Sequence, residues 1–313
     1  MVALVSVIIP VYNCKRFVAE AVQSALDQDY PNKEVIVIDD GSTDGTLDVL
    51  REFGDAIRLI AQKNAGPPVA RNNALHAARG DYVAFLDADD IWMQGKLTAQ
   101  VAHLDANPGV GTVLTNWHVW PAESDGSFKK PDFSSSPMTS PAIDERYSGW
   151  LYNRLLFDCE LLTTTVMMRT QLVRTIGDFD VTMFNGDDYD YWIRASRAAK
   201  ISRLKEIGAL YRVVPGSVSR KPQERNFECE VVSRALERWG PTGPDGEKSD
   251  SAAIKSRLEG LVLSHSYANL LRGNPKVALA GYWSVLRNRP ASARLWVKLG
   301  QSLWKVGARR IAS

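Results

Sequence analysis

The stretch Val83-Ala-Phe-Leu-Asp-Ala-Asp-Asp90 joins an apolar run, which predicts a buried strand, to three aspartates. Clustered aspartates repel one another unless a cation or hydrogen-bond donors neutralise them. Carboxylate oxygens are hard ligands that suit Mg²⁺ or Mn²⁺. We therefore expect Asp87 and Asp89 to hold a divalent cation, although these acids could instead cap the helix that follows.

Short β-branched runs alternate with helical patterns four times over the first 120 residues. Apolar strands linked by crossover helices indicate an α/β fold, with a mainly parallel central sheet that helices cover on both faces. Ligands of such folds gather at the carboxyl ends of the strands. The predicted strand and helix pairs are 5–9 with 15–28, 34–38 with 43–53, 57–61 with 68–79, and 82–86 with 93–107.

Polar residues collect where three of these strands end, at 10–13, 39–45 and 87–90. The sequence has no Gly-x-Gly-x-x-Gly motif after the first strand and no Gly-x-x-x-x-Gly-Lys-Ser/Thr motif. The pattern therefore predicts a ligand site at one edge of the sheet and excludes an ordinary dinucleotide or P-loop site.

Composition indicates an ordinary globular protein, since 45% of the residues are hydrophobic and 24% are charged. No apolar run approaches the roughly 20 residues of a membrane span, and no signal peptide is visible. Cys14, Cys159 and Cys229 form no Cys-x-x-Cys pair. Their odd number favours a reducing compartment, so we expect a cytoplasmic protein.

The C-terminal segment differs in charge from the rest, because residues 250–313 carry 11 Lys/Arg and 2 Asp/Glu. Residues 268–290 have the spacing of one tetratricopeptide-like helix pair, which cannot bury its own face. These helices should pack on the body of the protein, on a partner or on a membrane surface, and a solvated basic face is an equal alternative. No contact with nucleic acid is expected. The Pro- and Ser-rich stretch at 120–145 predicts a surface loop or a substrate lid.

Seven motifs follow one another over about residues 4–220. Their order and spacing resemble the inverting family 2 glycosyltransferases, whose fold is the GT-A nucleotide-diphospho-sugar transferase fold. They are Val7-Ile-Ile-Pro-Val-Tyr-Asn13, Val37-Ile-Asp-Asp-Gly-Ser-Thr-Asp44, Asn64-x-Gly66 with Ala70-Arg-Asn72, Phe85-Leu-Asp-Ala-Asp-Asp90, Ile176-Gly-Asp-Phe-Asp180, Gly186-Asp-Asp-Tyr-Asp-Tyr-Trp-Ile-Arg194, and Tyr211-Arg-x-x-Pro-Gly-Ser-x-Ser219.

This resemblance implies a nucleotide-diphosphate sugar as donor, with a UDP-sugar as the family-typical choice, and Mn²⁺ or Mg²⁺ at Asp87 and Asp89. The family position that matches Asp40 binds the base, and Arg71 would meet the base or a phosphate. Arg71 could instead be an ordinary surface arginine. Asp44 of the second motif could simply cap the helix that follows it. The residues implied for donor binding are Pro10, Tyr12, Asn13, Asp40, Asn64, Arg71, Asp87 and Ala88.

The family places its catalytic base in a late acidic pair, matched here by Asp187-Asp188. By position Asp188 is the base that removes the proton of the acceptor hydroxyl. The alternative is an acid cluster that the helix dipole favours, and both roles can hold. Family members often carry a histidine before the Pro-Gly-Ser segment, where this chain has Val214. Because valine cannot bind a metal, we expect weaker metal affinity.

We therefore expect a donor-binding half at 1–118, an acceptor-binding and catalytic-base half at 119–240, and a helical extension at 250–313. The expected reaction is metal-dependent, inverting transfer of a single sugar to an acceptor hydroxyl in surface glycan or glycoconjugate synthesis. We also expect that the basic tail can bind peripherally to the inner face of the membrane, where such glycans would be made. The alternative is a catalytically silent nucleotide-sugar-binding or scaffold protein of the same fold, and a nucleotidyltransferase is a more distant one.

Overall fold

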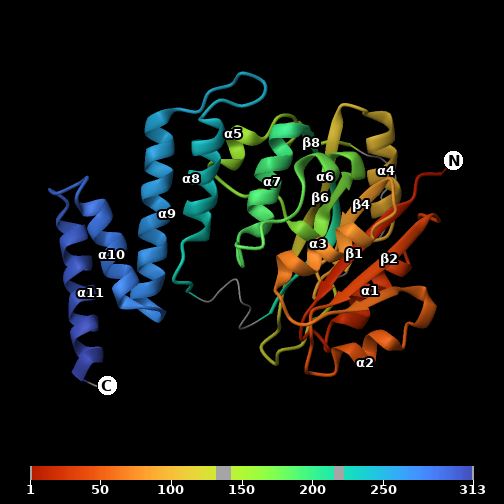
Figure 1. The fold of residues 1–313 in the computed structure, drawn as a ribbon, viewed down its shortest axis with the longest axis horizontal. Coiled ribbons are helices and arrows are strands. Elements are labelled where there is room, and N and C mark those ends of the chain that lie inside the picture. Colours follow the sequence, from red (N-terminus) through yellow and green to blue (C-terminus); the bar gives the residue numbers. More distant parts are fainter. Residues whose placement is uncertain (1, 132–141, 215–221, 312–313) are drawn as a thin grey trace. The chain divides into compact units, whose positions relative to one another are not determined.

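In the computed structural model, eight strands form one mixed sheet in the order β3-β2-β1-β4-β7-β6-β8-β5 (Figure 1). The structure describes residues 2–131, 142–214 and 222–311. Part of the predicted loop at 120–145, and the seventh motif from Pro215 onward, lie outside the described residues.

The first half of the sheet is parallel. Strand β1 pairs with both β2 and β4, and β2 pairs with β3. The predicted alternation of strand and helix over the first 120 residues is confirmed. The elements are β1 (Val5–Val11), α1 (Val18–Leu26), β2 (Lys33–Asp39), α2 (Thr46–Arg51), η1 (Gly54–Ala56), β3 (Arg58–Ala61), α3 (Pro67–Ala77), β4 (Tyr82–Phe85), β5 (Ile91–Trp92) and α4 (Lys96–Ala106).

The second half of the sheet mixes both strand directions. Strand β7 runs antiparallel to β4 and β6, β6 runs parallel to β8, and β5 runs antiparallel to β8. The predicted α/β class is therefore confirmed, with a mixed second half. The elements are β6 (Val110–Pro121), η2 (Glu145–Tyr147), α5 (Tyr152–Leu155), η3 (Thr163–Thr165), β7 (Val166–Arg169), α6 (Thr170–Ile176), α7 (Asp187–Ala198) and β8 (Lys200–Val213).

The central strands are apolar on both faces, because helices or loops cover both. Val7, Ile8 and Ile9 of β1 are fully buried, and each such side chain contributes about 1.5–3 kcal/mol through burial. Ser6 is the polar exception. Its hydroxyl donates to Glu34 over 2.6 Å and accepts from the Gly80 N–H over 2.8 Å, so it ties β1 to the turn before β4.

The chain divides into two compact units. Unit 1 comprises Met1–Pro215 with Gly243–Gly246, and unit 2 comprises Gly216–Thr242 with Glu247–Ser313. No helix in the described parts of either unit combines the length and hydropathy needed to cross a membrane.

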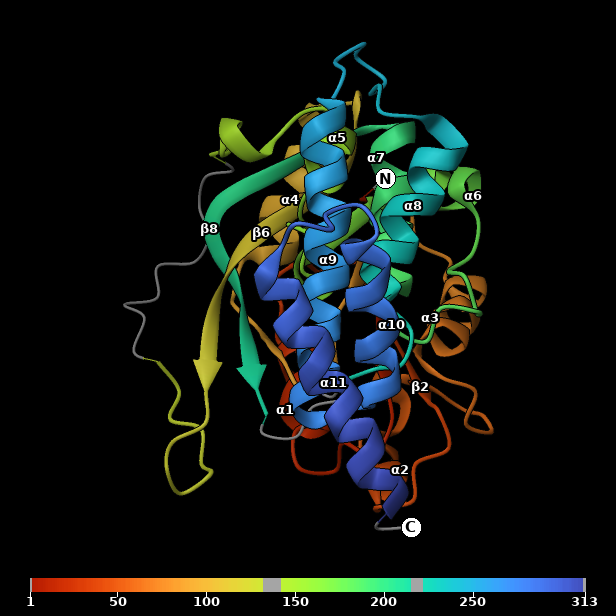
Figure 2. The same ribbon diagram turned by 90° about the vertical axis from the view of Figure 1, so that its left-hand side faces the viewer.

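Unit 2 is helical, as the sequence predicts for its C-terminal part. Side chains cap three helices at their N-termini, since Asn226, Asp250 and Asn274 accept hydrogen bonds from the following backbone. Helix α10 packs against both α9 and α11 around one apolar cluster (Figure 2). The helices are α8 (Phe227–Trp239), α9 (Ser251–Arg272), α10 (Pro275–Leu286) and α11 (Ala293–Ile311).

The close approach of α9 and α10 requires a glycine at 281. A Cβ atom at Gly281 would lie 2.0 Å from Ser266 Oγ, and Ser266 is fully buried. Gly260 of α9 offers a contrast, because a Cβ atom there would meet nothing within 4 Å.

We expect Gly281→Ala to lower the free energy of unfolding of unit 2 by about 1–2 kcal/mol, because overpacking outweighs the gain in helix propensity. Gly260→Ala is the matched control and should raise it by about 0.5–1 kcal/mol. Denaturant unfolding followed by circular dichroism measures both changes. Adding Ser266→Ala should restore most of the loss, and an unchanged Gly281→Ala protein would contradict the packing argument.

Candidate active site

The polar ends of β1, β2 and β4 meet at one edge of the sheet, as predicted. The Asn13 N–H donates to Ser42 Oγ over 2.9 Å, and Asn13 Oδ1 accepts from the Thr43 N–H over 2.8 Å. The Cys14 thiol donates to the carbonyl of Ala88 over 3.4 Å. Three strand ends that are distant in sequence are thus joined by hydrogen bonds.

Asp40, the predicted base-binding residue, is 3% exposed and shapes a loop. Its carboxylate accepts from Gln62 Nε2 over 2.7 Å and from the N–H groups of Ala65 and Gly66 over 2.9 Å. Asn64, which the resemblance implies for donor binding, donates through Nδ2 to the Asp40 carbonyl over 3.0 Å and so helps to hold this loop. The loop leads directly into α3, so Asp40 fixes where that helix begins.

The other predicted donor-binding residues of the first two strand ends divide into exposed and structural groups. Tyr12 is 52% exposed, and Pro10 is half-buried. Asp44 accepts from the N–H groups of Lys15 and Thr46 over 3.0 and 2.9 Å. The capping alternative for Asp44 therefore matches its contacts.

Arg71 lies between the two acidic motifs. Its Nη1 donates to Asp187 Oδ2 over 2.5 Å, and its Nη2 lies 3.4 Å from Asp87 Oδ1. The guanidinium also lies 5.6 Å from the centre of the Phe179 ring. Only 9% of Arg71 is exposed, so the surface-arginine alternative is wrong. Arg71 joins the start of α7 to the end of β4, and Arg71 and Asp187 are 116 positions apart in the sequence.

The charge of Arg71 is secured by its neighbours. Burial by itself lowers the pKa of the guanidinium, but the carboxylates of Asp187, Asp87 and Asp188 outweigh burial and raise the pKa above its ordinary value. One guanidinium group therefore balances part of the charge of three carboxylates. This arrangement leaves negative charge at the site for further cations to neutralise.

The acids after β4 fit a divalent cation. Burial raises the pKa of Asp89 to about 6, and the neighbouring Asp87 adds to the rise. Burial also raises the pKa of Asp87, where Arg71 opposes the rise and Asp188 adds to it. A divalent cation would stabilise the ionised form of both carboxylates, and Mg²⁺ or Mn²⁺ readily keeps water and phosphate oxygens as its other ligands. Within residues 2–131, 142–214 and 222–311, no three acidic, histidine or cysteine side chains form a complete metal cage.

Asp87 and Asp89 do not cap the following helix. Helix α4 begins only at Lys96, after Gly95, without a side-chain cap. Asp90 is 1% exposed and accepts from the Arg212 N–H over 2.8 Å. The three aspartates therefore separate into two half-exposed acids and one buried acid that anchors β8.

Arg212 supports this loop. It belongs to the seventh motif, for which the sequence alone indicates no such role. Its Nε donates to the Asp89 carbonyl over 2.7 Å, and its Nη2 pairs with Glu20 over 2.8 Å. The guanidinium lies 4.2 Å from the Trp120 ring centre and 4.4 Å from that of Phe17. Arg212 thereby fixes the backbone that carries Asp89.

Asp188, the predicted base, is half-buried in the first turn of α7. Its Oδ2 accepts from Thr163 Oγ1 over 3.1 Å, and its Oδ1 accepts from the Tyr189 N–H over 2.8 Å. Thr163 belongs to a run of three threonines that carries no recognisable motif. The structure therefore adds a residue that orients the candidate base.

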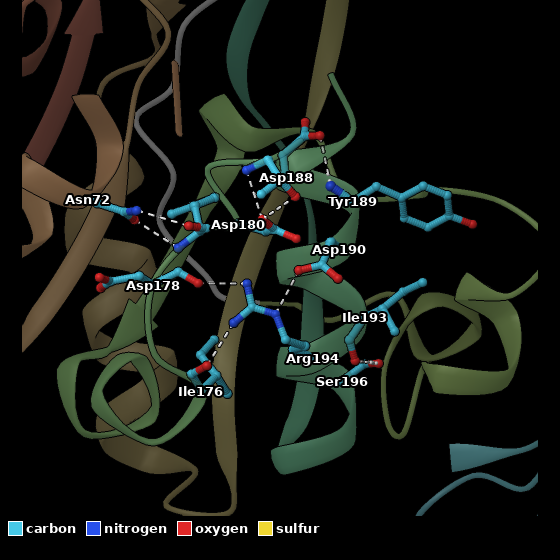
Figure 3. A network of polar contacts seen from close by, with 12 residues as sticks. Asn72, Ile176, Asp178, Asp180, Asp188, Tyr189, Asp190, Ile193, Arg194 and Ser196 are labelled. Carbon is cyan, nitrogen blue, oxygen red and sulfur yellow. Dashed lines mark hydrogen bonds and ion pairs between the residues drawn. The ribbon is translucent and has the colours of Figure 1, made fainter. Parts of the chain in front are cut away.

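Helix α7 is held in place by its own core and by Arg194. Tyr191 and Trp192 are fully buried. Arg194 donates to Asp190 and to the carbonyls of Ile176 and Asp178 over 2.7 to 2.8 Å (Figure 3). The start of α7 and the loop before it therefore form one rigid support for Asp188.

Comparisons with known proteins point to one family. The model of glycosyl transferase family 2 matches residues 6–149. The chain is 36% identical over 220 residues to the UDP-Glc:alpha-D-GlcNAc-diphosphoundecaprenol beta-1,3-glucosyltransferase WfaP of Escherichia coli, which covers 69% of this chain and 80% of that protein.

Two solved structures share the fold. TarS 1-349 of S. aureus in complex with UDP-GlcNAc matches with a TM-score of 0.60 and 21% identity, over 86% of this chain and 74% of that one. The mannosyltransferase PcManGT of Pyrobaculum calidifontis, in complex with GDP-Man and Mn2+, matches with a TM-score of 0.52 and 18% identity, over 98% of this chain and 86% of that one. The predicted GT-A architecture is thereby confirmed.

We expect Arg71→Met to lower the free energy of unfolding by about 3–5 kcal/mol, because it leaves the buried Asp187 carboxylate without its partner. Adding Asp187→Asn should recover part of this loss in a double-mutant cycle measured by denaturant unfolding. Arg51→Met, in an exposed pair with Asp48, is the control and should cost less than about 1 kcal/mol. Strictly additive effects at Arg71 and Asp187 would contradict a coupled pair.

We expect the affinity for Mn²⁺ to increase with pH through about 6. Below that pH the proton on Asp89 competes with the cation, and above it the carboxylate is ionised. Titration calorimetry should show roughly tenfold weaker binding at about pH 5 than at about pH 7.5. The variant Asp89→Asn should bind Mn²⁺ weakly at both pH values. Equal affinity of the parent protein at both would rule out Asp89 as a ligand.

Proposed function

This chain belongs to glycosyl transferase family 2, and on that premise we propose that it moves one sugar from a nucleotide-diphosphate sugar to an acceptor hydroxyl with inversion. We further propose that the reaction depends on a divalent cation. The observation that carries the proposal is the bridge through Arg71, which joins Asp87 of the acidic strand end to Asp187 beside Asp188. It brings a cation-binding pair and a candidate base into one site.

The donor side of this site consists of Asp87 and Asp89, which would hold the cation and, through it, the diphosphate. A bound divalent cation would stabilise the negative charge that builds up on the leaving nucleoside diphosphate. Tyr12 is exposed at the same edge of the sheet, where it could stack on the base. Asp40 would shape the base pocket through the loop that its carboxylate holds, whereas the resemblance implies a direct contact with the base.

Asp188 would take the proton of the acceptor hydroxyl as that oxygen attacks the anomeric carbon. One base and one direct displacement give inversion, because the new bond forms opposite the bond that breaks. Thr163 supports this role, since its hydroxyl donates to one oxygen of Asp188 and fixes the direction of the carboxylate. Arg71 would hold the carboxylate of Asp187 in an ion pair, which leaves the transfer of the proton to Asp188.

For the substrates, we propose a UDP-sugar and an acceptor sugar carried on a lipid diphosphate at the cytoplasmic face of the membrane. The Escherichia coli relative is named for transfer from UDP-Glc to a GlcNAc-diphosphoundecaprenol acceptor. The TarS structure holds UDP-GlcNAc, and PcManGT shows the same fold with Mn2+. The name of the Escherichia coli relative supports the addition of a single sugar to a lipid-linked glycan.

A scan of nucleotide sugars tests the proposal through release of the nucleoside diphosphate. We expect slow, Mn²⁺-dependent release from a UDP-sugar without acceptor, and faster release with a lipid-diphosphate-linked sugar. Asp188→Asn should lower the accelerated rate by roughly 10²–10⁴-fold, because a general base is lost. Asp48→Asn removes one carboxylate from an exposed pair with Arg51 and, as the control, should leave the rate within about threefold.

Two outcomes would overturn this function. Donor binding without release, for every nucleotide sugar and acceptor, would identify a catalytically silent binding protein. Equal rates for Asp188→Asn and the parent protein would remove Asp188 from the mechanism.

A further inference from the structure

Helix α11 carries large apolar side chains on a face that no other described residue covers. Trp296 and Leu303 are 51% and 53% exposed, and Val297 and Trp304 are 60% and 72% exposed. A folded domain rarely leaves two tryptophans and two aliphatic side chains open on one helix, and such patches mark sites of interaction. These four side chains are called the α11 face below.

The α11 face is separate from the face that packs within unit 2. Leu295, Leu299 and Ser302 are buried, and the two leucines belong to the apolar cluster of unit 2. At 3.6 residues per turn, the four side chains of the α11 face span about 120° of the helix circumference on another side. Gly300 lies within the same sector and adds no polar group. Helix α11 therefore has one apolar face that packs within unit 2 and a second apolar face that remains exposed.

The segment around the α11 face is positively charged throughout. Residues 260–313 contain nine Lys and Arg and no Asp or Glu. Lys298 and Lys305 lie on the side of α11 away from the exposed sector, where Lys298 approaches the Tyr267 ring and Lys305 donates to the Leu270 carbonyl. These two lysines contact α9, so it is the composition of the segment, with exposed tryptophan and leucine among many cations, that matches helices of a bilayer interface.

We infer that the α11 face binds the surface of an anionic lipid bilayer, with α11 lying in the plane of the interface. Trp296 and Trp304 would sit at the headgroup level, where the indole ring is apolar and its N–H meets polar groups. Val297 and Leu303 would enter the acyl boundary. The nine cations nearby would add attraction to acidic headgroups.

Charge complementarity favours a bilayer over a second copy of this chain. Two copies that met through the α11 face would bring together two segments that each carry nine cations and no acid. The nearest acid in the sequence, Glu259, already pairs with Arg289 of the same chain. Like charges across an interface oppose association. An anionic lipid surface offers the opposite charge and an apolar interior at once.

This inference goes beyond the proposed glycosyl transfer and does not depend on it. A chain held at the membrane would meet lipid-carried acceptors, but the α11 face would bind lipid whatever the catalytic unit does. A test with vesicles that contain neither sugar nucleotide nor glycan therefore separates the two.

Flotation of the full chain with vesicles of phosphatidylglycerol and phosphatidylcholine measures the binding. We expect the protein to float with these vesicles, to bind more weakly at high salt, and to stay unbound with pure phosphatidylcholine. The double variant Val297→Gln and Trp304→Gln should bind about tenfold more weakly, because it loses buried apolar area. Val181→Gln, at a side chain 57% exposed in unit 1, is the control and should bind like the parent.

The double variant should keep its helical circular dichroism and its rate of donor hydrolysis, since both side chains are exposed. Three results would overturn the inference. The parent protein could fail to float, or the double variant could float as well as the parent. Alternatively, the parent could be a dimer in vesicle-free solution that the double variant makes monomeric, which would assign the α11 face to a second copy.

Discussion

The candidate active site depends on one buried side-chain charge, the guanidinium of Arg71. Arg71 reaches Asp187 at the start of α7 and Asp87 at the end of β4, and it is nearly inaccessible to water. Burying a charge is costly unless it is paired, and removing either partner leaves an uncompensated charge inside the protein. The guanidinium is planar and has several donors, so it can serve two carboxylates from fixed directions. The position of Asp188 beside Asp187 follows from this pairing.

Most polar groups at the sheet edge build the site rather than face a substrate. Asp40 holds the loop before α3, Asp90 anchors β8, and Asp44 accepts from two backbone N–H groups. Because both oxygens of Asp40 accept hydrogen bonds inside the protein, its carboxylate loses little by being buried. The half-exposed acids are Asp87, Asp89 and Asp188. The chemistry is therefore concentrated in three carboxylates whose directions their neighbours fix.

Unit 2 is stabilised by contacts between its helices. Its helices have side-chain caps and one small apolar cluster, and a glycine at 281 allows α9 and α10 to meet. The exposed α11 face has no comparable partner among the described residues, although its composition is as apolar as that of a core. Unit 1 also exposes apolar side chains, such as Tyr12 and Val181, whereas unit 2 exposes four of them on one face of a single helix.

The sequence by itself determined the alternation of strands and helices, the convergence of three polar strand ends, and the two acidic motifs, because local periodicity and chain order encode these features. Only the tertiary structure decided the partners of Arg71, the loop-holding bonds of Asp40, and the supporting roles of Thr163 and Arg212. Each of these contacts joins residues at least 16 positions apart, and no local pattern records such pairs. For α11, periodicity revealed apolar residues, but only packing could show which of them are buried and which remain open.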